Sequence, residues 1–204
     1  MGEAASATTD ETPETPADAT PVARLARRDG GIALAALSLF GAADAWHAAT
    51  GLAFAALLTV VNGAIVGWVL GTLAHEWGHF AGARLSGGIA PTRPYRSLFP
   101  IFDLDLDRSD PAAFRAMSVA GNVAHWGMVL ALALLVPMDA AGRQALVCGA
   151  FAFAVSASTT ELPIIQRALA GTPPKQCFAG LTGAKLRRDR RIGAAAGLAL
   201  FLVV

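Results

Sequence analysis

Two histidines and a glutamate lie together in residues 75–79, which read His-Glu-Trp-Gly-His. On a helix, positions i and i+4 share a face, so the imidazoles of His75 and His79 can bind one metal ion. Glu76 then points at the adjacent coordination position, where its carboxylate can take a proton from water. Two neutral nitrogen ligands and a nearby carboxylate suit a zinc hydrolase. The spacing therefore predicts a catalytic Zn²⁺ site.

The surroundings of this motif favour the metal interpretation over a chance match. Residues 45–74 contain no Asp, Glu, Lys or Arg, so the motif ends a long apolar stretch. In a soluble helix, His-Glu-x-x-His is often only a surface charge pattern. Within a membrane span no solvated face is available, and ionisable residues there are rare and usually functional.

Composition indicates a membrane protein of one domain. The chain has 204 residues, of which 54% are hydrophobic and 15% are charged, whereas about a quarter of the residues of a globular domain are charged. Residues 1–23 are rich in Ala, Thr, Pro and acid, and we expect a disordered cytoplasmic tail. Residues 24–204 form the predicted membrane-embedded domain.

The predicted fold is an all-α polytopic membrane protein with four transmembrane helices and a short C-terminal apolar helix. A span needs about 20 apolar residues. Thr50-Gly51 marks the first turn, although Asn62-Gly63 is a competing turn signal. The expected spans are residues 31–49, 54–84, 113–137 and 144–166, with a shorter apolar helix at 192–204.

Basic residues predict the orientation in the bilayer. With these spans, 15 of the 16 Lys and Arg residues fall on one side, and only Arg143 falls on the other. By the positive-inside rule that side, with the N-terminus, is cytoplasmic. We expect an integral protein of the cell membrane, the inner membrane in a bacterium. The basic run at 185–191 is read as a topology and lipid-headgroup signal, so no nucleic-acid partner is expected.

Other polar residues reach the depth of the histidines. At 1.5 Å per residue, His75 and His79 lie roughly 8–14 Å from the cytoplasmic edge, and Glu161 lies about 9 Å from it. A catalytic zinc usually has three protein ligands and one open position. Glu161 is the predicted third ligand, because a lone carboxylate in an uncharged span needs a partner. The alternative for Glu161 is an ion pair with Arg167.

Asn122 and His125 reach the same level, roughly 10–15 Å deep. His125 is the rival third ligand; otherwise it polarises the substrate or an intermediate. Asn122 is a candidate donor to a developing oxyanion, and an interhelical contact is the alternative. Pro163 is expected to break its helix and open room around the metal.

The loop after the second span contains a predicted β-strand. Residues 102–107 read Phe-Asp-Leu-Asp-Leu-Asp, with apolar groups on one face and aspartates on the other. Such a strand at the membrane surface can pair with an extended substrate backbone. A half-buried strand with a solvated acidic face is the alternative.

Residues 75–80, followed by Ala83-Arg84 and Gly87, resemble the site-2 protease family of intramembrane zinc metallopeptidases. That family has a Gly-Pro-x-x-Asn-like motif on the next span, where residues 118–125 lie here. Asn122 replaces the proline of that motif and His125 replaces the asparagine. The family's third ligand is usually an aspartate in a Leu-Asp-Gly-like motif, and its nearest substitute is Glu161-Leu162-Pro163. The resemblance covers roughly residues 54–167.

The resemblance implies a zinc-dependent endopeptidase that hydrolyses peptide bonds in or near transmembrane segments of other proteins, with Glu76 as general base and then proton donor. Two alternatives remain open at this point. One is a non-catalytic relative that binds a metal or a partner helix. The other is a small transporter that uses the His/Glu cluster to move a cation. Nothing in the sequence specifies an oligomeric state.

Overall fold

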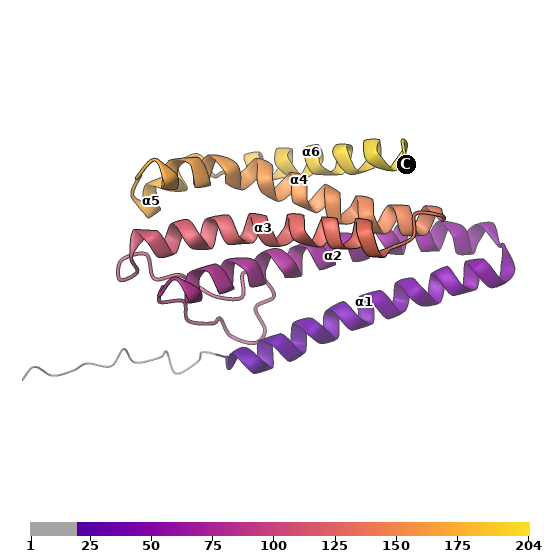
Figure 1. Cartoon of the computed structure of the whole chain (residues 1–204), viewed down its shortest axis with the longest axis horizontal. Coiled ribbons are helices and arrows are strands. Elements are labelled where there is room, and N and C mark those ends of the chain that lie inside the picture. Colours follow the sequence, from indigo (N-terminus) through magenta and orange to yellow (C-terminus); the bar gives the residue numbers. More distant parts are fainter. Residues whose placement is uncertain (1–19) are drawn as a thin grey trace, which may run out of the picture.

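The structure, a computed structural model, describes residues 20–204 and is helical over most of that range (Figure 1). Four of its helices are long and apolar enough to cross a membrane, as predicted. Residues 1–19 of the tail predicted at 1–23 lie outside the described residues. In chain order the helices are α1 (Val22–Thr50), α2 (Ala53–Leu85), α3 (Pro111–Leu135), α4 (Ala141–Leu169), α5 (Pro174–Cys177) and α6 (Gly183–Phe201).

The first turn lies where the sequence predicts it. Gly51 ends α1 with a φ of 63°, a left-handed conformation that glycine adopts without strain. The competing signal at Asn62-Gly63 is wrong, because both residues lie inside α2. Gly63 serves helix packing instead, since an added Cβ would collide with the backbone of Gly142 in α4. At its other end α1 begins at Val22, nine residues before the predicted span.

Helices α2, α3 and α4 pack against one another, while α1 packs on α2 and α6 packs on α4 (Figure 1). Small residues bring α2 and α4 close together. A Cβ on Gly67 would collide with the carbonyl oxygen of Leu146, and one on Gly149 with that of Ala64. In membrane bundles such glycines allow backbone-to-backbone contact. The three central helices therefore form a close-packed layer in which polar side chains can meet.

The β-strand predicted at residues 102–107 is wrong: within residues 20–204 there is only an isolated antiparallel bridge between Thr92 and Phe102. Residues 101–105 do run beside 89–93, and the backbone N–H of Asp103 donates to Pro91 at 3.0 Å. Pro91 has no N–H to return that bond, and the N–H of Ile89 donates to the Ser109 hydroxyl instead. A regular ladder is therefore interrupted.

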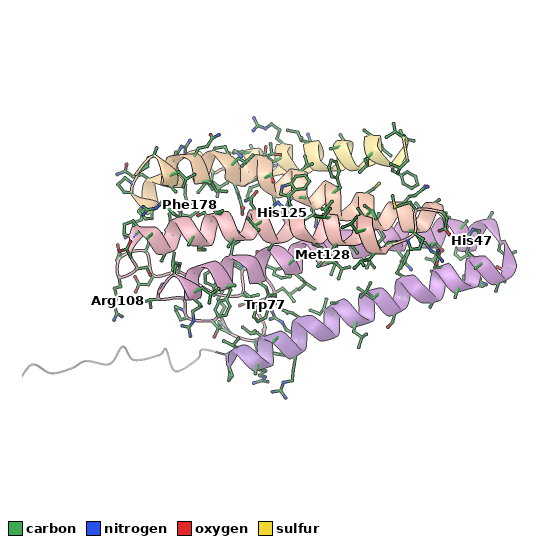
Figure 2. All side chains as sticks on the ribbon, viewed as in Figure 1. His47, Trp77, Arg108, His125, Met128 and Phe178 are labelled. Carbon is green, nitrogen blue, oxygen red and sulfur yellow. The ribbon has the colours of Figure 1, made fainter. Side chains whose placement is uncertain are left out.

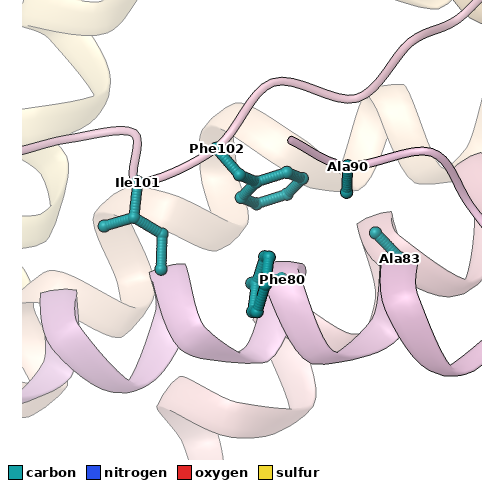
Figure 3. Packing of buried hydrophobic residues seen from close by; sticks show 5 residues of the cluster. All are labelled: Phe80, Ala83, Ala90, Ile101 and Phe102. Carbon is teal, nitrogen blue, oxygen red and sulfur yellow. The ribbon is translucent and has the colours of Figure 1, made fainter. Parts of the chain in front are cut away.

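The same loop covers the end of α2 with apolar side chains. Phe102 packs on Phe80, and Ala83, Ala90 and Ile101 complete this buried cluster (Figure 3). Arg28 of α1 holds the loop from the other side, because its guanidinium donates to the carbonyl oxygens of Tyr95 and Ser97, both at 2.7 Å. The loop is therefore fixed between α1 and α2.

Pro163 does not break α4, contrary to the prediction, since the helix continues to Leu169. The C-terminal helix also differs from the predicted 192–204. It begins at Gly183, includes the whole basic run at 185–191, and is not among the four helices that are long and apolar enough to cross a membrane. Asp189, Gly193 and Gly197 are its buried residues, so small or paired side chains face α4.

Candidate metal centre

Three ligand atoms from two helices converge inside the bundle. His75 and His79 come from successive turns of α2, and Glu161 comes from α4. The two Nε2 atoms lie 3.1 Å apart, and Glu161 Oε1 lies 3.0 Å from His75 Nε2 and 3.1 Å from His79 Nε2. The group is a candidate metal site by residue type and spacing. The structure thus brings together the three residues that the sequence analysis selected as ligands.

The donor set and its size suit zinc. Two imidazole nitrogens and one carboxylate oxygen form a familiar catalytic ligand set, and tetrahedral coordination at 2.0–2.1 Å places ligand atoms about 3.3 Å apart. The three separations of 3.0–3.1 Å are close to that value. These three residues therefore fit a Zn²⁺ ion in ligand type and spacing.

Close packing of α3 against α2 positions His79. A Cβ on Gly78 would lie 2.5 Å from the Ala124 Cβ, and a Cβ on Gly121 would collide with the His79 ring. Because both positions are glycine, His79 Nδ1 reaches the carbonyl oxygen of Met117 at 2.8 Å. A carbonyl only accepts, so Nδ1 carries a proton, and Nε2 is the nitrogen that faces the ligand group and could bind a metal ion.

His125 of α3, labelled in Figure 2, is fully buried. It lies against His75 and does not belong to the group of three. Its Nδ1 lies 3.0 Å from Nδ1 of His75, the nitrogen that faces away from the ligand group. Its Nε2 lies 3.2 Å from the Ser158 hydroxyl. Glu161 rather than its rival His125 therefore completes the three ligand atoms.

Asn122 is also engaged within the protein. Its Nδ2 donates to Glu161 Oε2 at 2.7 Å, and its Oδ1 accepts from the Ser158 hydroxyl at 3.0 Å. Neither Asn122 nor His125 lines the large cavity beside the site. In this arrangement Asn122 contacts Glu161 and His125 contacts His75, and the catalytic roles considered for both side chains stay predictions.

A cavity of about 740 Å³ opens beside the candidate metal group. His75, Glu76 and Glu161 line it, so the carboxylate of Glu76 is half-buried at the wall of the same space as the ligands. Leu98 and Phe99 of the loop, with Leu186 and Arg190 of α6, line other parts of the wall. Polar groups thus converge at one end of a mostly apolar cavity, as in many active sites.

The sequence analysis missed Ser158 and Trp126. Trp126 Nε1 donates to the Ser158 hydroxyl at 3.0 Å, so this hydroxyl has three partners in all. Helical spacing offered a signal, because Ser158 precedes Glu161 by three residues and His125 follows Asn122 by three. Side chains at i and i+3 share a helix face, so Ser158 lies on the face of α4 that carries Glu161.

No protein-family model, curated protein or solved structure matches this chain. The resemblance to the site-2 protease family therefore rests on the motifs of residues 75–87 and 118–125.

Proposed function

We propose that this chain is a zinc-dependent intramembrane endopeptidase, similar to site-2 proteases, that hydrolyses peptide bonds in or near transmembrane segments of other proteins. The observation that carries the proposal is the convergence of His75, His79 and Glu161 to within 3.0–3.1 Å. Glu76 lines the adjoining cavity. A candidate metal group on helices suited to a membrane, beside a substrate-sized space, supports hydrolysis within the bilayer.

His75, His79 and Glu161 would hold the ion, which when bound acts as a Lewis acid toward a carbonyl and toward water. Glu76 holds and moves the proton: its carboxylate takes a proton from the attacking water and then gives it to the amine that leaves. Asn122 holds the Glu161 carboxylate through the 2.7 Å hydrogen bond to Oε2. The apolar cavity wall limits the access of other water molecules.

The substrate we propose is a membrane protein, because the site lies between helices that are long and apolar enough to cross a bilayer. Its backbone must be extended where it is cleaved, since helical hydrogen bonding occupies the carbonyl groups of a folded span. The roughly 740 Å³ cavity accommodates a few residues of such a segment.

The proposed location is the bacterial inner membrane, with the N-terminus cytoplasmic. At one end of the bundle lie the start of α1, the loop between α2 and α3, and α5 (Figure 1). All basic residues other than Arg143 lie in or next to segments that meet at this end. Arg143 lies near the other end, where it pairs with Asp44 at 2.9 Å. The positive-inside rule then supports a cytoplasmic N-terminus.

Glu76→Gln tests the proposal, because it removes the proton acceptor and keeps the shape of the side chain. Zinc is measured in the detergent-purified wild type and variant, and both proteins are co-expressed with a panel of tagged single-span membrane proteins. We expect about one zinc per chain in both, and cleaved products only with the wild type. Cleavage that persists in Glu76→Gln would exclude this mechanism. Zinc binding without cleavage by the wild type would favour the non-catalytic alternative.

A further inference from the structure

A continuous set of hydrogen bonds joins His75 and Glu161, two of the three proposed ligands, on the side away from the candidate metal position. It runs from His75 through His125, Ser158 and Asn122 to Glu161, with separations of 3.0, 3.2, 3.0 and 2.7 Å. His125 and Ser158 are buried, and Asn122 is 9% exposed. Because little water reaches these groups, each donor must find its acceptor within the set.

The positions of the protons in these hydrogen bonds can be assigned by starting from the carboxylate of Glu161. An ionised Glu161 accepts only, so the side of Asn122 that faces it is the NH₂ group. The amide oxygen of Asn122 therefore faces Ser158, and the single hydroxyl proton of Ser158 is donated to it. The Ser158 oxygen can therefore only accept from His125 and Trp126. The Trp126 contact is consistent with this assignment, because the indole Nε1–H can only donate.

The hydrogen-bond partners of His125 and His75 also fix their protons. His125 Nε2 faces an oxygen that has no proton left to give, so Nε2 carries the proton of His125. The Nδ1 of His125 then has a lone pair, and the opposing Nδ1 of His75 carries a proton that it donates. With a metal ion bound, His75 Nε2 then has its lone pair directed at the ion, between it and Glu161 Oε1. Met117 imposes the same state on His79 by a separate contact.

We infer that Ser158 is a positioning residue that fixes the proton positions of His125, and through it of His75, so that the ligand nitrogen is free of protons. This inference rests on the proposed zinc centre. The Ser158 hydroxyl is linked to both His75 and Glu161. It accepts a hydrogen bond from His125, which contacts His75, and it donates one to Asn122, which contacts Glu161. The carbonyl of Met117, by contrast, acts on His79 alone.

The test uses the full chain labelled with ¹⁵N-histidine, in detergent, with NMR of the ring nitrogens. The chain has only four histidines, and single His→Gln variants assign their signals. With zinc bound we expect the proton on Nδ1 in His75 and His79 and on Nε2 in His125. In Ser158→Ala, His125 should change to a mixture of its two tautomers, and the Nδ1 signal of His75 should shift because its acceptor is no longer fixed, while His79 stays as it is. A general loss of structure would change all three.

Zinc affinity gives the second measurement. Loss of an outer hydrogen-bond partner typically weakens metal binding about 10–100-fold, and we expect this for Ser158→Ala. The matched control is Ser118→Ala, because Ser118 is also buried but bonds only the Phe114 carbonyl of its own helix. Its spectra and affinity should equal those of the wild type. The inference is overturned if His125 carries its proton on Nδ1, or if Ser158→Ala leaves both histidines and the affinity unchanged.

The outcome separates this inference from the proposed function. If the wild type binds zinc but cleaves no membrane protein, the protease proposal fails and the spectra still decide the role of Ser158. If cleavage occurs and the Ser158→Ala spectra equal those of the wild type, the positioning role fails and the protease proposal remains.

Discussion

Lys185 Nζ donates a hydrogen bond of 3.1 Å to the carbonyl oxygen of Thr159. That carbonyl lies four residues before Pro163 in α4 and so has no backbone N–H partner within the helix. Lys185 also pairs with Asp189, which is fully buried and accepts from Arg188 at 3.1 Å. One side chain of α6 thus replaces the donor that the proline removes, two residues before the proposed ligand Glu161.

Lys185→Met should destabilise the protein, because the Thr159 carbonyl loses its donor and buried Asp189 loses one of its cationic partners. An unpartnered buried acceptor costs about 1–3 kcal/mol, more when it is charged, so we expect a loss of about 2–3 kcal/mol in the free energy of unfolding. Denaturant unfolding in mild detergent measures it. Lys175→Met is the control, since Lys175 forms an exposed pair with Asp107 and should have little effect. Equal effects would contradict the role given to Lys185.

Gly78→Ala should push α3 away from α2, because the new methyl group would lie 2.5 Å from the Ala124 Cβ and 2.7 Å from the Ala120 carbonyl oxygen. Overpacking of this kind costs about 1–3 kcal/mol. It should also weaken zinc binding, since His79 is held by Met117 of the displaced helix. Gly41→Ala in α1 is the matched control, because nothing lies within 4 Å of its added Cβ. Zinc titration and unfolding of the two variants give the comparison.

Sequence reasoning predicted the elements that depend on local patterns. The long apolar stretches predicted four long helices, and the His-x-x-x-His spacing predicted two imidazoles on one face of α2. Depth below the basic residues also selected Glu161, because a residue's position along a helix fixes its height in the bilayer. These expectations need only the rise per residue and the helical period.

The predictions that were wrong depend on groups that a neighbouring helix or loop segment contributes. Pro163 alone predicts a broken helix, whereas α4 continues and Lys185 of α6 supplies a donor to the Thr159 carbonyl. The alternating residues 102–107 predict a strand, but a paired strand requires N–H groups that Pro91 and Ile89 do not provide. His125 has suitable chemistry for a ligand, yet its rotation about α3 places it behind His75. Side-chain direction between helices is not encoded in local spacing.

Asp29→Ala should free the loop that lines the proposed substrate cavity. Asp29 is 3% exposed and accepts from Arg28 at 2.7 Å and from Trp77 Nε1 at 3.0 Å. Without it, Arg28 loses the partner that orients it toward the Tyr95 and Ser97 carbonyls. We expect faster hydrogen exchange and proteolysis within residues 94–99. The free energy of unfolding should fall by about 2–4 kcal/mol, because a buried charged network is broken.

Asp103→Ala provides the comparison for that loop. Asp103 belongs to the same loop and pairs with Arg93 at 2.6 Å, but its side chain is 61% exposed. Surface pairs contribute little, so this variant should keep the wild-type exchange rates in residues 94–99. Matching acceleration in both variants would show that any loss of charge loosens the loop, and would contradict the specific role of Asp29.

Zinc removal should lower stability only when Glu161 is present. A ligand that binds the folded state alone, at 100 times its dissociation constant, stabilises by about 2.7 kcal/mol. The wild type should therefore lose about that much in a chelator, whereas Glu161→Ala should show little difference between zinc and chelator. Asp44→Ala controls for the loss of a carboxylate, since Asp44 pairs with Arg143 outside the metal group. It should be less stable and keep the full dependence on zinc. A full dependence on zinc in Glu161→Ala would mean that the ion binds without this carboxylate and would remove Glu161 from the ligand set.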